Sequence, residues 1–362
     1  MKVVFVSNND WDGLWYQRQQ FATMYAERGH KVLFINKTLQ RLPKLKDFKE
    51  RFAKKSKAMS NPIPNGVSVV SIYTLPPLKC FNRINRLILG RKLKPLGFES
   101  ADLLITYIPT YTALSIIDLL TPKKAAYINV HNYDADEVVR DLLLAEIDLC
   151  QRVDYLLADS VFNRQRLTRI SGREAFDSLP GVHTNVFKQS FRGDEANKRQ
   201  TIMYFGGIGS HLDFNLYNQL SDHFTVTFIG KFNSEELREK LSPKILVHPP
   251  VPNSTLAQLL KEADIIGIFY LQSDYIDGVI PAKIYECLAT MKPIIATGMG
   301  EMKALEGLVY QADNSFESVV KIIKKLPDTE NESCRNKRKE VASEADWEKR
   351  FQKLNERIGV NV

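Results

Sequence analysis

Short apolar runs alternate with longer segments in which apolar positions recur every three or four residues. Fully apolar runs are typical of strands buried on both faces of a parallel sheet, and the longer periodic segments are typical of helices with one buried stripe. The alternation predicts an α/β protein with doubly wound parallel sheets. We expect strands at residues 3–7, 31–35, 67–72, 102–106, 125–130 and 154–158, and then at 201–205, 224–229, 245–248, 264–269 and 294–297.

The strand series stops and restarts near the middle of the chain. Residues 193–200 are polar and charged, as in a linker, and a new strand follows them directly. The 362 residues also exceed the ~250–300 residues over which a single core grows. We therefore expect two domains, residues 1–186 and 187–342, with a last amphipathic helix in 343–362 that returns to the first domain.

Composition is that of an ordinary globular protein, with 44% hydrophobic and 25% charged residues. No apolar run approaches the ~20 residues needed to span a bilayer. The chain begins with Met-Lys and the first expected strand follows directly, without an apolar signal segment. We therefore expect a cytoplasmic protein. The four cysteines are scattered, which argues against disulfide or zinc frameworks.

The net charge of +8 is concentrated in one region. Residues 41–94 contain fourteen Lys or Arg against two acidic residues, a local charge of +12. Two stretches there, 37–60 and 81–94, have the spacing of basic amphipathic helices, which favours an anionic membrane surface. Packing of these helices on their own domain is the alternative. Nucleic acid is disfavoured as a partner because few aromatic residues are interleaved for base stacking.

The most informative stretch is 274–297. Proline is favoured at the first helical position, so we expect a helix to begin at Pro281, with Ile284, Cys287 and Leu288 facing inward. Lys283 then puts positive charge in the first turn, against the helix dipole, and a nearby anion such as a diphosphate would resolve this conflict. Glu286 could accept hydrogen bonds from a ribose diol. The alternative is a solvated ion pair between Lys283 and Glu286.

Polar side chains follow several first-domain strands, where doubly wound sheets bind ligands. Asp10 and Asp12 follow the first strand, and His131 and Asp134 follow the strand at 125–130. Asp10, Asp12 and Asp134 could instead cap helices, and His131 could be a structural histidine. Asp134-Ala135-Asp136 also matches a metal-binding D-x-D, an interpretation we discount because Asp134 and Glu137 have the spacing of a helix cap.

The stretch from Pro281 to Thr297 resembles the nucleotide-sugar site of GT-B glycosyltransferases, with the pattern P-x-K-x-x-E-Y-L-A-x-G-K-P-V-V-A-T. Cys287 replaces the usual aromatic residue, Met291 replaces a glycine, and Gly278 stands where retaining members often carry a second Glu. The turn Gly206-Gly207-Ile208-Gly209 resembles the phosphate loop of the second GT-B domain, and Lys231 follows a strand whose turn would lie beside the base pocket. The first strand and helix resemble the first GT-B unit, whose loop faces the acceptor.

The resemblance implies a GT-B fold, with an acceptor domain, a nucleotide-sugar domain and a cleft between them. It implies transfer of a sugar from a nucleoside diphosphate, UDP more than GDP, to a carbohydrate or lipid-linked acceptor of the cell envelope. We expect no metal, a slight preference for inversion, and peripheral attachment to the inner face of the membrane. A 2-epimerase of sugar nucleotides and a non-catalytic partner subunit are the alternatives.

The residues expected to bind the donor are Gly206, Gly207, Lys231, Val279, Ile280, Pro281, Ala282, Lys283 and Glu286, and the candidate bases are Asp134, His131 and Asp12.

Overall fold

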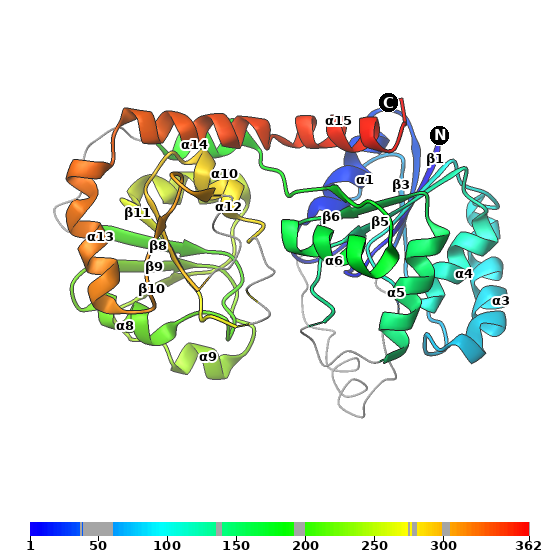
Figure 1. The fold of residues 1–362 in the computed structure, drawn as a ribbon, viewed down its shortest axis with the longest axis horizontal. Coiled ribbons are helices and arrows are strands. Elements are labelled where there is room, and N and C mark those ends of the chain that lie inside the picture. Colours follow the sequence, from blue (N-terminus) through cyan, green and yellow to red (C-terminus); the bar gives the residue numbers. More distant parts are fainter. Residues whose placement is uncertain are drawn as a thin grey trace. The chain divides into compact units, whose positions relative to one another are not determined.

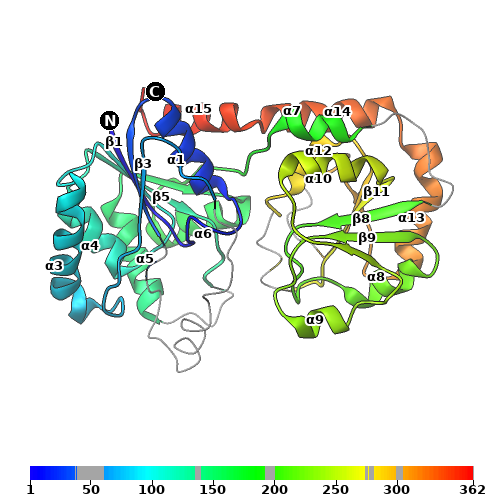
Figure 2. The same ribbon diagram turned by 180° about the vertical axis from the view of Figure 1, so that it is seen from behind.

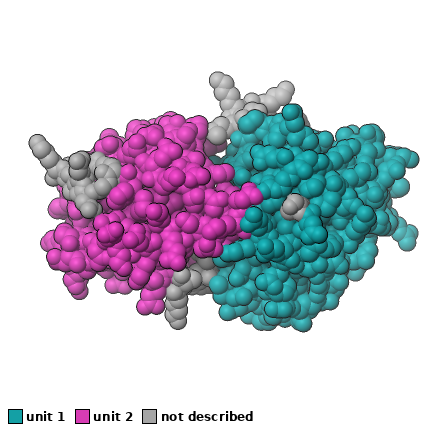
Figure 3. Space-filling model, turned by 90° about the horizontal axis from the view of Figure 1, so that it is seen from above, with its two compact units in different colours: residues 1–179, 351–362 teal, residues 180–350 magenta. Residues whose placement is uncertain are grey.

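The structure, a computed structural model, describes residues 1–36, 38, 61–134, 140–191, 200–273, 276, 281–298 and 305–361. The chain divides into two compact units, unit 1 (residues 1–179 and 351–362) and unit 2 (residues 180–350), coloured separately in Figure 3. Both divisions lie a few residues from the boundaries expected from the sequence. The reason is a short bridge in which Val182 exchanges backbone hydrogen bonds with Ala345 and Trp347, which draws all three residues into unit 2.

Unit 1 contains a seven-stranded parallel sheet in the order β3-β2-β1-β4-β5-β6-β7 (Figure 1). The six strands expected in this part of the sequence are confirmed, and the two-residue β7 was missed because it is too short to show a period. The strands are β1 (Lys2–Val6), β2 (Lys31–Ile35), β3 (Val67–Val70), β4 (Leu103–Thr106), β5 (Lys124–Asn129), β6 (Tyr155–Ala158) and β7 (Phe176–Asp177).

Helices cover both faces of the unit 1 sheet. Val4, Leu33 and Leu104 face one core with α3, α4 and α5, whereas Phe5 and Phe34 face α1, where Tyr25 contacts Phe5. Alternate residues of each strand are therefore buried on opposite sides, which explains the fully apolar runs. The helices are α1 (Gln17–Glu27), α3 (Asn82–Leu93), α4 (Tyr111–Leu120), α5 (Arg140–Arg152) and α6 (Val161–Ser171).

Unit 2 contains a six-stranded parallel sheet in the order β10-β9-β8-β11-β12-β13. The helices α10, α12 and α14 lie on one side of it and α8 and α9 on the other (Figures 1 and 2). The strands are β8 (Thr201–Phe205), β9 (Thr225–Ile229), β10 (Leu246–His248), β11 (Ile265–Phe269), β12 (Ile294–Thr297) and β13 (Tyr310–Gln311). The helices are α7 (Thr184–Phe187), α8 (Phe214–Ser221), α9 (Glu235–Glu239), α10 (Asn253–Leu259), α12 (Ile284–Ala289), α13 (Phe316–Thr329) and α14 (Glu332–Glu344).

The last helix, α15 (Trp347–Arg357), belongs to both units. From Phe351 onward it is part of unit 1, where the Phe351 ring is fully buried 4.7 Å from the ring of Tyr25. The Tyr25 hydroxyl also bonds to the Asn355 side chain at 2.5 Å. The expectation that a C-terminal helix returns to the first domain is confirmed.

Each sheet reverses its strand order at one position. In unit 1 the first strand, β1, lies between β2 and β4, and in unit 2 β8 lies between β9 and β11. In doubly wound sheets ligands bind beyond the carboxyl ends of the strands at such a switch point. The two positions to search are therefore the ends of β1 and β4 in unit 1, and the ends of β8 and β11 in unit 2.

Candidate functional site

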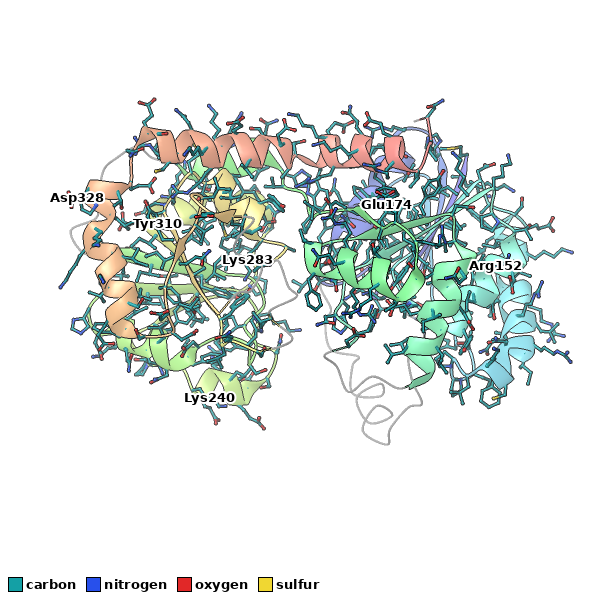
Figure 4. The ribbon with its side chains drawn as sticks, in the orientation of Figure 1. Arg152, Glu174, Lys240, Lys283, Tyr310 and Asp328 are labelled. Atoms are coloured by element: carbon teal, nitrogen blue, oxygen red, sulfur yellow. The ribbon has the colours of Figure 1, made fainter. Side chains whose placement is uncertain are left out.

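Lys283 lies at the switch point of unit 2 (labelled in Figure 4). β11 pairs with β8 only at Ile202 and Met203, so the last two residues of β8 have no partner in β11. The ammonium of Lys283 donates to the carbonyl of the last of these residues, Phe205, at 2.6 Å. The separation of two strands thus creates the position that a lysine fills.

The surroundings of the Lys283 ammonium are aromatic. It lies 3.8 Å from the centre of the Tyr204 ring and 6.0 Å from that of Tyr270, and within the described residues no carboxylate forms an ion pair with it. Burial lowers the pKa of Lys283 to about 7. A desolvated ammonium with no negative partner is costly for a protein to maintain, and an anionic ligand would remove that cost.

The expectation that a helix begins at Pro281 was wrong. Residues 281–283 form a turn in which the Ile284 N–H donates to the Pro281 carbonyl at 2.8 Å, and α12 begins at Ile284. Lys283 is therefore the N-cap residue rather than part of the first turn. Because α12 has only six residues, its dipole is small and Lys283 itself supplies most of the positive charge.

Glu286 lies in the first turn of α12 and is partly buried. Within the described part of the chain its carboxylate has no hydrogen bond or ion pair. The Lys283 ammonium instead donates to the Phe205 carbonyl and lies over the Tyr204 ring. The alternative of a Lys283–Glu286 ion pair is therefore wrong. Burial raises the pKa of Glu286 to about 7, against the opposing effect of Lys283. The inward stripe is confirmed, since Ile284, Cys287 and Leu288 are fully buried.

The turn after β8 approaches Lys283 closely. Gly206 has a φ of +115°, and a Cβ there would lie 2.8 Å from the Lys283 ammonium. A Cβ on Gly230, in the turn after β9, would lie 1.8 Å from the Gly206 carbonyl oxygen. Both glycines are thus required for the two turns and the lysine to pack together.

Gly207 differs from every other described glycine. It does not have a positive φ, and a Cβ added to it would meet no atom within 4 Å, so nothing in the described structure requires a glycine there. Its carbonyl accepts from the Tyr204 hydroxyl at 2.7 Å, and no described residue accepts from its N–H. An open space beside an unpaired amide, next to Lys283, suits a phosphate oxygen.

His211 completes this group and was missed in the sequence. Its ring lies 4.8 Å from that of Tyr270 in an edge-on arrangement, and burial followed by the charge of Lys283 lowers its pKa to about 4. It therefore stays neutral near pH 7 and can donate or accept a hydrogen bond. A histidine six residues after a strand has no distinctive spacing, so only the fold could identify it.

The remaining residues expected to bind the donor are less informative. Lys231 accepts from the Ile208 N–H through its carbonyl at 2.9 Å while its side chain is exposed, and the side chain of Ala282 is also exposed. Val279 and Ile280 lie outside the described residues, as does Gly278. The residues that the structure brings together in unit 2 are Gly206, Gly207, Lys283 and Glu286, with His211 added.

The loop after β1 in unit 1 is held by the first turns of α1. The Gln19 amide donates to the carbonyls of Asp10, Trp11 and Leu14, and its oxygen accepts from the Tyr16 N–H at 3.2 Å. Asp12 is exposed and accepts from the Asn61 N–H at 3.0 Å. Asp12 therefore anchors the returning chain rather than capping α1, which begins at Gln17.

The loop after β5 carries the other two candidate bases. Both carboxylate oxygens of Asp134 are occupied, by Arg166 at 2.8 Å and Arg169 at 3.3 Å. Arg166 also forms a two-point pair with the buried Glu146, at 3.0 and 2.7 Å. Asp134 is thus part of an ion-pair network, whereas the partly exposed His131 lies 4.9 Å from the Tyr133 ring, centre to centre.

Two residues near His131 were missed in the sequence. Asp159 follows β6 directly, accepts from the Asn163 side chain at 3.0 Å, and interacts electrostatically with Arg18 and His131. Burial raises the pKa of Asp159 to about 6 despite the opposing effects of Asn163, Arg18 and His131. Arg18 comes from α1, so these three residues are brought together from distant parts of the sequence by the sheet order.

Across the described residues, no group of three or more His, Cys, Asp or Glu side chains has an arrangement that could hold a metal ion. The expectation that the reaction needs no metal is not tested by this observation and stays a prediction.

No protein-family model matches the chain. It is 23% identical over 235 residues to TuaH of Bacillus subtilis (strain 168), whose name assigns it to teichuronic acid biosynthesis as a glycosyltransferase. This match covers 60% of the chain and 59% of the length of the curated relative.

Solved structures match nearly the whole chain. A glycosyltransferase from Rickettsia africae ESF-5 has a TM-score of 0.69 at 13% identity and covers 99% of this chain and 97% of its own. Anabaena Alr3699/HepE in complex with UDP and glucose has a TM-score of 0.69 at 15% identity, covering 99% of each chain. WaaG, a glycosyltransferase involved in lipopolysaccharide biosynthesis, has a TM-score of 0.62 at 12% identity, covering 98% of this chain and 99% of WaaG. At these identities the likeness shows the fold, which is the GT-B fold expected from the sequence.

Proposed function

We propose that this chain, which has the GT-B fold, is a glycosyltransferase that uses a nucleoside diphosphate sugar. The donor is a UDP-sugar in preference to a GDP-sugar, and the acceptor is a carbohydrate or a lipid-linked carbohydrate of the cell envelope. The likeness to HepE with UDP supports the choice of nucleotide. The names of TuaH and WaaG, which refer to teichuronic acid and lipopolysaccharide, support the choice of acceptor class.

The observation that carries the proposal is the Lys283 ammonium at the end of β8, with no carboxylate partner among the described residues. In glycosyl transfer the nucleoside diphosphate leaves with additional negative charge. Lys283 and the Gly207 N–H would stabilise that charge, and Glu286, one turn further along, would accept from the ribose hydroxyls. Such preorganised electrostatic stabilisation is commonly the largest part of catalysis.

Metal independence is a further part of the proposal. A lysine that already neutralises charge on the diphosphate supplies what a divalent cation would otherwise supply. The preference for inversion rests on Gly278 in the sequence and stays a prediction.

We place acceptor activation in unit 1 and assign the base to His131, with Asp159 as the carboxylate close to it. A base must lie within hydrogen-bond reach of the acceptor hydroxyl from which it takes a proton. Asp134 is less suited because two arginines occupy both of its oxygens, and Asp12 is less suited because it holds Asn61.

We also propose that the enzyme works in the cytoplasm, attached peripherally to the inner face of the membrane. None of the described helices has the length and apolar content to cross a bilayer. Attachment would use α3, whose Ile84 and Leu87 are 48% and 65% exposed among basic residues. The other basic stretch, residues 37–60, lies outside the described residues except for Thr38.

Calorimetric titration with UDP tests the donor site. We expect Lys283→Met to weaken UDP binding about tenfold to a hundredfold, the effect of one lost charge-assisted hydrogen bond, without lowering the melting temperature. Gly207→Ala should also weaken binding in a fully stable protein, because its methyl group would enter the open space assigned to phosphate. EDTA should leave both UDP affinity and turnover unchanged.

Lys292→Met is the matched control. Lys292 is 6% exposed and donates to the carbonyls of Lys261 and Ala263, so its loss should lower the melting temperature and leave UDP affinity intact. The donor site is refuted if Lys283→Met behaves like Lys292→Met. Conversion of the donor sugar without any acceptor would instead indicate an epimerase.

A further inference from the structure

Three arginines are buried in the described part of the chain, and one of them lacks an acidic partner. Arg166 pairs with Glu146 and Asp134, and Arg338 pairs with Glu330 through two bonds of 2.6 and 2.9 Å. Arg18 is 5% exposed, and no carboxylate among the described residues forms an ion pair with it. Buried charges are normally paired, so Arg18 requires an explanation.

The contacts of Arg18 leave most of its donors unused. Nη2 donates to the Asn9 side chain, and the guanidinium lies 4.4 Å from the centre of the Tyr16 ring and 5.6 Å from that of Tyr107. Nε is buried without a partner. No described residue accepts from Nη1, which is not among the buried unpaired atoms and therefore reaches solvent.

Asp159 does not serve as the missing partner. It interacts with Arg18 electrostatically but forms neither a hydrogen bond nor an ion pair with it. A carboxylate in a close pair with arginine has a lowered pKa, whereas burial raises the pKa of Asp159. Burial likewise lowers the pKa of Arg18, and the nearby tyrosines and Asp159 do not restore it.

Arg18 also lies where a doubly wound sheet binds ligands. Asn9 follows β1, and Tyr107 follows β4, so the guanidinium sits at the switch point of unit 1. Tyr107 is itself held in place, since its hydroxyl donates to Gln17 at 3.3 Å and Gln17 donates to the Ser178 carbonyl at 2.9 Å.

From these contacts we infer that Arg18 binds an anionic group, a phosphate ester or a carboxylate, carried by the ligand of unit 1. The ligand is the acceptor if the proposed function is correct, so this inference narrows the acceptor to an anionic carbohydrate. Planar guanidinium groups suit both oxyanions equally. A phosphate linking a sugar to a carrier and the carboxylate of a uronic acid are the two sources, and binding measurements separate them.

The test is calorimetric titration of the full chain saturated with UDP, which blocks the unit 2 site, at constant ionic strength. The probes are glucose 1-phosphate, glucuronate and the neutral methyl glucoside. We expect at least one anionic probe to bind wild type more tightly than methyl glucoside, and Arg18→Met to reduce that binding about tenfold to a hundredfold. Preference for glucose 1-phosphate assigns a phosphate-linked acceptor, and preference for glucuronate assigns an acidic sugar.

Three variants make the result decisive. Arg28→Met removes a positive charge from the far end of the same helix, where Arg28 lies over the Phe351 ring, and should leave anion binding unchanged. Arg18→Lys keeps the charge and should bind with intermediate affinity. Asp159→Asn removes the carboxylate that interacts electrostatically with Arg18 and should tighten binding several-fold, so the inference stays testable even if Arg18→Met folds poorly.

The inference is overturned if neither anion binds better than methyl glucoside, or if Arg18→Met and Asp159→Asn leave anion binding unchanged. Its failure is separate from failure of the proposed function. UDP binding that depends on Lys283 with no anion effect at Arg18 refutes the inference alone. Absence of UDP binding refutes the donor proposal, while the anion titration can still be done without nucleotide.

Discussion

Burial shifts the pKa values of Lys283 and Glu286 toward neutrality, which makes the charge of each group sensitive to a bound ligand. Burial lowers the pKa of the lysine to about 7 and raises that of the glutamate to about 7. Each group is therefore close to losing its charge in the free protein. A diphosphate would restore the charge on Lys283, and ribose hydroxyls would favour the ionised form of Glu286.

These shifts predict a maximum of UDP affinity near pH 7. Above that pH the free protein loses the proton of Lys283 that the diphosphate requires, so affinity falls as pH rises. Below it Glu286 becomes protonated and accepts ribose hydroxyls less well, so affinity falls as pH decreases. The neighbouring His211, Cys287 and Tyr204 do not change charge in this range, because burial lowers the pKa of His211 to about 4 and raises that of Cys287 and Tyr204.

Titration calorimetry from pH 5.5 to 8.5, in buffers of different ionisation enthalpy, measures the decrease in UDP affinity on each side of the maximum. Each decrease should be visible within about one pH unit of the maximum. Proton uptake on binding above pH 7 and release below it are the expected signs. In Lys283→Met the decrease above pH 7 should disappear. A flat profile in wild type would show that the nucleotide does not contact these two groups.

At the scale of elements, the loop after β5 depends on α5 and α6. Arg166 of α6 joins Asp134 of the loop to Glu146 of α5, and Glu146 also accepts from Tyr127 and Asn129 of β5 at 2.8 and 2.9 Å. This network fixes the loop that carries His131. Asp134 therefore holds the loop in place, and His131 of the same loop is the proposed base.

The two roles predict opposite behaviour in mutants. His131→Ala should lower turnover by about two to four orders of magnitude, the usual contribution of a general base, with UDP affinity and melting temperature unchanged. Asp134→Asn should keep turnover within about tenfold and lower the melting temperature, because it leaves part of the arginine network unpaired. Turnover and thermal unfolding measured side by side distinguish them. If Asp134→Asn loses turnover at unchanged stability, Asp134 is the base.

At the scale of the whole molecule, the proposed membrane attachment rests on the basic region. The described part of the basic region includes α3, which presents Ile84 and Leu87 beside Arg83, Arg86 and Arg91. Each basic residue near an anionic surface contributes about 1 kcal/mol of binding free energy. Exposed apolar side chains add insertion into the interface.

Liposome flotation at low salt measures this attachment. We expect wild type to bind vesicles with anionic lipid and not neutral vesicles, and the double substitution of Ile84 and Leu87 to Asn to reduce the bound fraction. Leu246→Asn is the control, because Leu246 is 54% exposed in β10 of unit 2, away from the basic region in sequence. Equal flotation with anionic and neutral lipid would contradict membrane attachment through this region.

Most strands could be predicted from the sequence, because a parallel strand buried on both faces is a continuous apolar run whatever its neighbours are. Lys283 could also be singled out locally, since a lysine near a helix start conflicts with the helix dipole. The exact start of α12 could not, because it depends on the turn that Pro281 makes.

The sequence by itself determined the α/β class, the two-domain organisation and the location of the proposed donor motif, since all three depend on residues close together in the chain. Only the tertiary structure decided which charges are paired. Arg18, Tyr107 and Asp159 come from α1 and from the ends of β4 and β6, and their proximity follows from the strand order of the sheet. Whether a buried charge has a partner depends on such long-range contacts, so an unpaired arginine at the switch point has no signature in the sequence.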